Sequence, residues 1–158
     1  MPENNDKLIN MLIMHEGLKL HVYDDADGRA EVKKDYTLTG HPTIGVGRNI
    51  ASDGLGISEK EARYLLSNDI KRVVKETSSW DFMEELNDVR KAVIYDMVFN
   101  MGITRFNPDV WVNTFNAIKK KDFETAANEM LSSRWAKQVG NRSIRLSDMM
   151  RKGEWYDR

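Results

Sequence analysis

The chain has 158 residues, and its 24 Lys and Arg nearly balance its 25 Asp and Glu. This length suits one domain that buries most of its apolar surface. The sequence has no cysteine, which excludes disulfides and thiolate metal sites. The first six residues form no basic signal region, and no apolar run approaches the roughly 20 residues of a membrane span, so we expect no stable membrane insertion.

Positive charge is concentrated near the C-terminus. Residues 113–158 carry ten Lys and Arg against six Asp and Glu. A solvated helical surface explains this excess at least as well as a site for an anionic polymer. We therefore expect no nucleic-acid partner, and we expect a monomer.

The N-terminal part predicts one helix and then a small β-containing portion. Apolar residues at helical spacing predict a helix over residues 5–15 that ends near Glu16, where a glycine follows. Partial alternation over 19–23 and the turn composition of 24–28 predict a hairpin. Residues 43–47 predict a strand whose glycines permit the close approach of a ligand or another backbone.

The rest of the chain predicts helices. Ser58 and Glu61 form a capping box at the start of a long helix. A helix over 89–101 is apolar on most sides and belongs at the centre of a helical portion. Three further helices are expected: one that opens at Asn107-Pro108 with proline at its first position, one over 123–131 and one over 142–151.

We therefore expect a single domain over residues 1–158, of the α+β class and mostly helical. A small β-containing lobe over 17–57 would be joined by a connecting helix over 58–80 to a helical lobe over 81–158. The helix over 5–15 would pack on the larger lobe, which offers more apolar surface. A cleft between two lobes is a common site for a polymer.

Two carboxyl groups and a threonine in the N-terminal part suit the cleavage of a glycosidic bond. This reaction uses a carboxylic acid that protonates the leaving oxygen, and a carboxylate that attacks the sugar or activates water. Glu16 follows a run of apolar residues and could stay protonated, whereas Asp25 in a polar turn would stay ionised. Taken alone, either residue type at such a position is usually a solvated surface residue.

Other classes of site lack their residues. The three histidines show no His-Glu-x-x-His spacing, which together with the absence of cysteine argues against zinc. No serine lies in a Gly-x-Ser-x-Gly turn, and Gly45-Val46-Gly47 is too short for a dinucleotide-binding loop. We expect neither a cofactor nor a metal.

Several short motifs follow one another along nearly the whole chain: Glu16-Gly17-Leu18-Lys19-Leu20, Tyr23-Asp24-Asp25, Pro42-Thr43-Ile44-Gly45-Val46-Gly47, Ser67-Asn68-Asp69, Met97-Val98-Phe99-Asn100-Met101-Gly102, Ser133-Arg134-Trp135 and Asn141-Arg142. In this order they resemble the phage-type lysozymes, the endolysin family of the T-even bacteriophages. The resemblance implies a lysozyme-like fold. It also implies hydrolysis, without a cofactor, of the β-1,4 bond between N-acetylmuramic acid and N-acetylglucosamine in bacterial peptidoglycan.

The resemblance also implies roles for individual residues. Glu16 would be the general acid, Asp25 the second carboxylate and Thr43 a residue that helps to place the attacking water, with inversion at the anomeric carbon. Arg142 would lie near the catalytic acid. Four further residues would contact the substrate, although core packing is an equal alternative for the aromatic one: Asn49, Phe99, Thr114 and Glu129.

The sequence departs from the family pattern in three respects. Arg48 stands where the family commonly has a histidine, and if it pairs with Asp69 of the long helix, that link titrates only through the carboxylate. The stretch over 29–41 makes this region longer than in the short family members, and its Glu31 and Asp35 are rival carboxylates to Asp25. The near-zero net charge predicts weaker attraction to an anionic wall at low salt.

Two other functions stay open. A lytic transglycosylase would cut the same bond with the sugar's own 6-hydroxyl in place of water, and a non-catalytic lysozyme-fold module would only bind wall or protein partners. As an endolysin for host cell lysis, the protein would be made in the host cytoplasm and act on the wall in the periplasm. It would then depend on a membrane-permeabilising partner, a holin.

Overall fold

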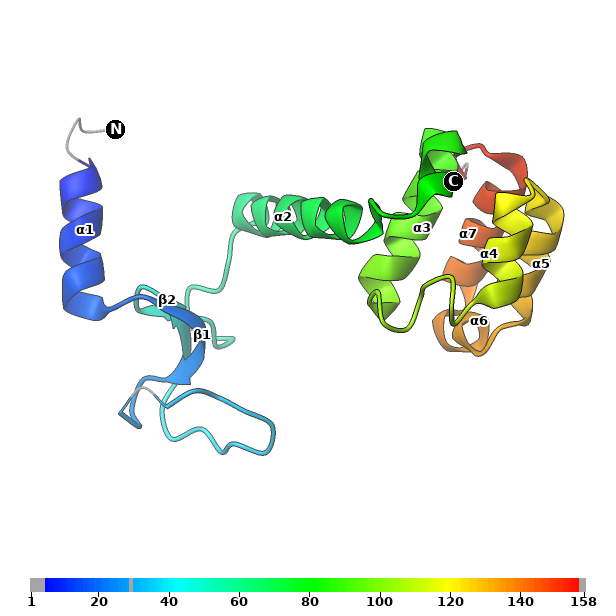
Figure 1. Ribbon diagram of the computed structural model, residues 1–158. Helices are drawn as coiled ribbons and strands as arrows, with labels where there is room; N and C mark the ends of the chain where they lie inside the picture. Colours follow the sequence, from blue (N-terminus) through cyan, green and yellow to red (C-terminus); the bar gives the residue numbers. More distant parts are fainter. Residues whose placement is uncertain (1–4, 29, 157–158) are drawn as a thin grey trace. The chain divides into compact units, whose positions relative to one another are not determined.

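The computed structural model describes residues 5–28 and 30–156 (Figure 1). Residues 1–4, Arg29 and residues 157–158 lie outside the described part; they include the start of the long stretch over 29–41 and both ends of the expected domain. The chain divides into two compact units, Met1–Arg63 and Tyr64–Arg158. The predicted lobe boundaries, and the packing of the N-terminal helix on the helical lobe, stay predictions.

The described residues confirm an α+β, mostly helical fold with a small sheet. Helix α1 (Asn5–Glu16) ends where Gly17 has a φ of 76° and donates its N–H to the Ile13 carbonyl at 2.8 Å. A left-handed residue that ends a helix is most easily glycine. The end of α1 at Glu16 therefore follows from local sequence, as predicted.

The sheet is antiparallel, in the strand order β1 (Lys19–Asp24), β2 (Pro42–Gly45) and β3 (Arg48–Asn49). In its register Tyr23 lies opposite Thr43, and Thr43 lies opposite Asn49. A strand is present where one was predicted over 43–47, but it spans Pro42–Gly45, and the chain then turns and forms β3.

The stretch over 29–41 adds to the free edge of β1. Val32 donates its N–H to the Val22 carbonyl at 2.9 Å, and Glu31 forms an antiparallel bridge with Tyr23. The predicted hairpin after β1 is therefore present, and its second arm comes from this stretch.

The same stretch then closes on the side chain of Asp24. This carboxylate is fully buried and accepts hydrogen bonds from the backbone N–H groups of Ala26 (3.0 Å), Thr39 (2.6 Å) and Gly40 (2.9 Å), and from the Thr39 hydroxyl (3.0 Å). Burial acts to raise the pKa of Asp24, but these hydrogen bonds outweigh it and lower the pKa to about 2. The sequence of this stretch shows no helical or strand periodicity, and its conformation is instead held by hydrogen bonds to the buried Asp24 carboxylate.

The hydroxyl of Tyr36 lies between two carboxylates. It donates to Asp27 at 2.6 Å, and it lies 3.3 Å from Oδ2 of Asp24. The hydrogen bond to Asp27, burial and the nearby negative charges raise the pKa of Tyr36. Tyr36 therefore stays protonated and connects the turn after β1 to the stretch that covers Asp24.

Helix α2 (Glu59–Thr77) begins at the predicted capping box. Ser58 Oγ accepts from the N–H of Glu61 at 3.2 Å, and Glu61 Oε2 accepts from the N–H of Ser58 at 2.7 Å. None of the helices in the described part of the chain is long and apolar enough to cross a membrane.

The second unit continues with η1 (Asp81–Glu85), α3 (Asp88–Met101), α4 (Val112–Lys119), α5 (Phe123–Ser132), α6 (Arg134–Val139) and α7 (Asn141–Lys152). Figure 1 shows α3 beside the cluster of shorter helices at the C-terminal end. Val93, Ile94 and Met97 of α3 are fully buried in the core. The predicted central helix is confirmed.

The prediction that a helix opens at Asn107-Pro108 is wrong. Asn107 Oδ1 instead accepts from the N–H groups of Asp109 (3.0 Å) and Val110 (3.1 Å) and forms a local turn. Trp111 then takes a φ of −102° and a ψ of 51°, so α4 begins only at Val112. Asparagine competes with helix formation by bonding its neighbouring backbone in this way.

We expect Asp24→Asn to lower the thermal unfolding temperature by several degrees, because an amide nitrogen at this site would face N–H donors. In the wild type, the folded state lowers the pKa of Asp24 from 3.8 to about 2, so it binds this proton less tightly than the unfolded chain. The stabilisation is therefore present above pH 3.8 and is lost as the pH falls through 2. Circular dichroism melts between pH 2 and pH 7 measure both effects.

Asp35→Asn is the matched control, because Asp35 is exposed and Asn tolerates its φ of 67° equally well. A variant Asp24→Asn that melts like Asp35→Asn at neutral pH would contradict the role of the buried carboxylate.

Candidate active site

The carboxylate of Glu16, the last residue of α1, lies against the turn between β2 and β3. A Cβ atom on Gly47 would lie 3.3 Å from Oε2 of Glu16, and Gly47 also has a φ of 65°. The positive φ therefore favours glycine here, and a side chain would also require the exposed Glu16 carboxylate to move by a few tenths of an ångström. The prediction named a ligand or another backbone as the neighbour of these glycines, whereas the structure places the Glu16 side chain beside Gly47.

Asp25 and Thr43 are brought together by the backbone of His41. The His41 carbonyl accepts from the Asp25 N–H at 3.2 Å and from the Thr43 hydroxyl at 3.1 Å. The His41 N–H donates to Oδ1 of Asp25 at 2.6 Å, and His41 Nδ1 lies 3.3 Å from Oδ2. The carboxylate of Asp25 is thus oriented while its side chain stays 41% exposed.

The rival acids lie in different surroundings from Asp25. Asp24 is sealed from solvent and its oxygens are occupied by backbone donors. Glu31 and Asp35 are exposed, the first at the bridge with Tyr23 and the second in a turn. Among these four acids, Asp25 alone is both exposed and hydrogen-bonded to His41, whose carbonyl also accepts from the Thr43 hydroxyl.

Thr43 and Asn49 lie opposite each other on β2 and β3. Thr43 is only 3% exposed, and its hydroxyl proton is donated to His41. Asn49 Oδ1 accepts from the N–H of Ala51 at 2.8 Å and packs closely against Gly54. The amide oxygen of Asn49 therefore stabilises the loop that follows β3 by accepting a hydrogen bond from its backbone.

Arg48 connects β3 to the start of α2. Its guanidinium lies 3.0 Å from Oε1 of Glu61 and donates to the Gly56 carbonyl at 3.0 Å. The hydrogen bonds from Ser58 lower the pKa of Glu61, and the charge of Arg48 adds to this effect. The predicted pair of Arg48 with Asp69 would join the two units and stays a prediction.

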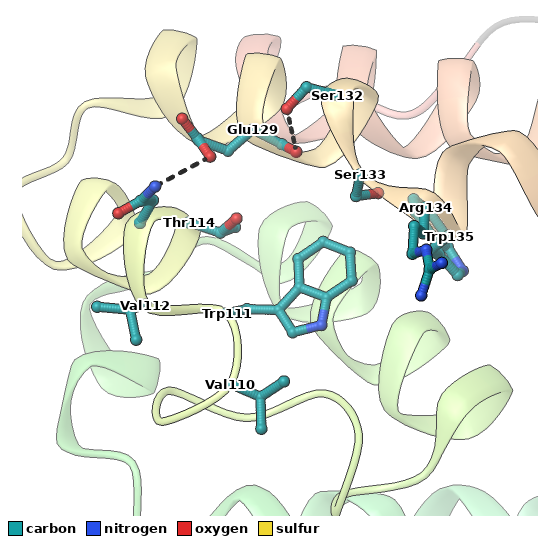
Figure 2. Close-up of a pocket in the computed structure, with 10 residues that line it drawn as sticks. Val110, Trp111, Val112, Thr114, Glu129, Ser132, Ser133, Arg134 and Trp135 are labelled. Carbon is teal, nitrogen blue, oxygen red and sulfur yellow. Dashed lines mark hydrogen bonds between the residues drawn. The ribbon is translucent and has the colours of Figure 1, made fainter.

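Thr114 and Glu129 lie together in a pocket of about 490 Å³ in the second unit. Figure 2 shows the indole of Trp111 in the middle of this group, and Glu129 accepts a 3.4 Å hydrogen bond from Asn113. The pocket is lined by ten residues from α4, α5, α6 and their flanks: Val110, Trp111, Val112, Asn113, Thr114, Glu129, Ser132, Ser133, Arg134 and Trp135.

Phe99 and Arg142 line a different hollow of about 370 Å³. The Phe99 side chain is 45% exposed, so it is not a core residue of the second unit. Arg142 donates to Oδ1 of Asp96 at 2.9 Å, which gives its guanidinium a carboxylate partner inside this unit. Its predicted place near Glu16 would join the two units and stays a prediction.

His41, Asp24 and Trp111 are the important residues that the sequence reasoning missed or left undecided. The sequence placed Asp24 only among a pair of adjacent acids and Trp111 only on the inward side of the helix expected from Asn107-Pro108, and no spacing pointed to His41. Within residues 5–28 and 30–156, the structure brings no three His, Asp or Glu side chains into an arrangement that could hold a metal ion.

The chain is similar to known proteins over most of its length. Residues 14–152 match the family described as Phage lysozyme. The chain is also 26% identical over 160 residues to the probable T4-type lysozyme 1 of Dictyostelium discoideum, an alignment that covers 91% of this chain and 93% of that protein.

We expect Gly47→Ala to lower the free energy of unfolding more than Gly45→Ala. Both glycines have a positive φ, so each alanine costs about 1–2 kcal/mol of backbone strain. Open space surrounds Gly45, whereas a Cβ on Gly47 would require the exposed Glu16 side chain to shift by a few tenths of an ångström, which we expect to cost up to about 1 kcal/mol more if its rotamer is strained. Urea unfolding of both variants measures the difference.

The control is the same pair of variants in a Glu16→Ala background, where the difference should disappear. If the difference persists there, the contact between Glu16 and Gly47 is not its cause.

Proposed function

The chain belongs to the phage lysozyme family, and from this premise we propose that it is an inverting muramidase of the endolysin type, with Glu16, Asp25 and Thr43 as its catalytic group. Its substrate bond would be the β-1,4 linkage between N-acetylmuramic acid and N-acetylglucosamine in bacterial peptidoglycan. The observation that carries the proposal is the arrangement around His41, which joins an exposed, oriented carboxylate to the threonine of the family pattern.

Glu16 would act as the general acid that protonates the leaving oxygen. Its side chain is exposed at the end of α1, and its carboxylate lies next to Gly47 of the β2–β3 turn. A general acid must be held within hydrogen-bond reach of the atom that it protonates, and a position supported by a helix end and a tight turn suits this task.

Asp25 would supply the second carboxylate that activates water or stabilises the positive charge developing on the sugar. Its contacts with His41 restrict the rotation of the carboxylate without burying it. The neighbouring Asp24 cannot share this role, because its oxygens are already occupied within the fold.

Thr43 would support the water from β2. Because its hydroxyl proton is donated to His41, the oxygen presents only lone pairs, which accept a hydrogen from water. The Thr43 side chain is 3% exposed and contacts His41 in the structure. Its contact with water is proposed from the family pattern.

The proposed substrate contacts are Asn49 in the first unit and Phe99, Thr114 and Glu129 in the second. The pocket around Trp111 combines aromatic side chains with hydroxyl groups and one carboxylate, a composition that suits a sugar with polar substituents. Arg142 keeps its proposed place near the catalytic acid.

We expect Glu16→Gln to reduce the clearing of outer-membrane-permeabilised bacteria by roughly 100- to 10,000-fold, the contribution typical of a general acid. Its unfolding temperature should stay within a few degrees of the wild-type value, because Glu16 is exposed. A turbidity assay measures the rate, and a thermal melt of the same sample measures folding. Full clearing by this variant would falsify the acid assignment.

Two further measurements separate the alternatives. Asp25→Ala should lose activity, whereas Asp35→Asn, which removes the charge of an exposed acid and tolerates its φ of 67°, should keep it. Mass spectrometry of the products should show a reducing end with one added water. An anhydro end would instead indicate a lytic transglycosylase, and a folded wild type that binds peptidoglycan without cutting it would indicate a non-catalytic module.

We further propose that the protein is made in the host cytoplasm and reaches the periplasmic wall with the help of a holin. Bacteria that express it alone are expected to keep their optical density, and co-expression of a membrane-permeabilising protein should release it. Prompt lysis by the protein alone would contradict this dependence.

A further inference from the structure

We propose that the side chain of His41 is a positioning residue for the Asp25 carboxylate, a role that rests on the proposed function. His41 contacts both oxygens of that carboxylate: its N–H donates to Oδ1 at 2.6 Å, and its Nδ1 lies 3.3 Å from Oδ2. One residue thus defines both the position and the plane of the proposed second carboxylate.

The backbone of His41 is itself fixed from both sides. The preceding residue, Gly40, donates its N–H to the buried Asp24 carboxylate at 2.9 Å, and the following residue begins β2. Gly40 also packs so closely against Asp25 Oδ1 that a Cβ there would overlap it. The Asp25 carboxylate is therefore confined between the Gly40 backbone and the His41 side chain.

The imidazole acts on Asp25 without the cost of burial. The side chains of His41 and Asp25 are 53% and 41% exposed, so both stay in contact with solvent. A proton on Nδ1 lets the ring donate toward Oδ2, and a second proton on the ring adds a positive charge. In both forms the imidazole restricts the rotation of the carboxylate, and a catalytic group that is already oriented lowers the entropic cost of reaction.

Three substitutions at His41 test this role. Asparagine carries its amide nitrogen on Cγ, where it can replace Nδ1, whereas the nitrogen of glutamine lies one bond farther and corresponds to Nε2. We expect His41→Ala and His41→Gln to lower kcat about 3- to 10-fold, as for a partly exposed contact to a charged group, with little change in KM. His41→Asn should keep most of the wild-type kcat. All three variants retain the backbone contacts and should melt near the wild-type temperature.

The controls separate positioning from general structural damage. His21→Ala removes an exposed histidine of β1 in the same unit and should leave kcat unchanged. The carbon-13 carboxyl signal of Asp25 should shift in His41→Ala and not in His21→Ala. In an Asp25→Asn background, His41→Ala should cause no further loss of activity, because residues that act as one unit are not additive.

Each outcome decides a different assignment. A fully active His41→Ala beside an inactive Asp25→Ala overturns the role of His41 and leaves the proposed function intact. Equal losses for His41→Ala in the wild-type and Asp25→Asn backgrounds, or for alanine and asparagine at position 41, also overturn it. A fully active Asp25→Ala overturns the second-carboxylate assignment and, with it, this inference.

Discussion

The buried carboxylate of Asp24 is the interaction on which the arrangement of the N-terminal unit depends. A charge removed from water is tolerated only where hydrogen-bond donors replace the lost solvation. Here the donors are the turn after β1 and the backbone of Thr39 and Gly40, so the long stretch that follows β1 is held against the sheet. Because His41 comes next, the same interaction determines where the Asp25 carboxylate lies.

The adjacent aspartates Asp24 and Asp25 therefore lie in opposite environments. Asp24, the last residue of β1, is buried, whereas Asp25, the first residue of the turn that follows, is exposed. One carboxylate is enclosed by hydrogen-bond donors of the fold, and the other stays in contact with solvent. The same separation of roles by environment is known from paired carboxylates in glycosidases.

Local signals made much of this structure predictable. The end of α1, the start of α2 at its capping box and the end of α3 at Gly102 depend on residues within four positions, whereas the helix predicted over 58–80 ends already at Thr77. The donors to Asp24 beyond its own turn are 15 and 16 residues away, and no spacing rule reaches that far. The start of α4 was misplaced because the Asn107 side chain bonds its own backbone. The order of motifs was informative since it spans the chain, yet it contained no signal for His41.

The buried acid also constrains how this region can change in descent. An aspartate at position 24 without the stretch that covers it would leave a charge with too few donors, while the stretch without the aspartate would leave the N–H groups of Thr39 and Gly40 without an acceptor. Neither intermediate is a favourable step. The acid and the stretch are therefore energetically coupled, and we expect a shortening of this loop to be tolerated best together with a change of residue 24.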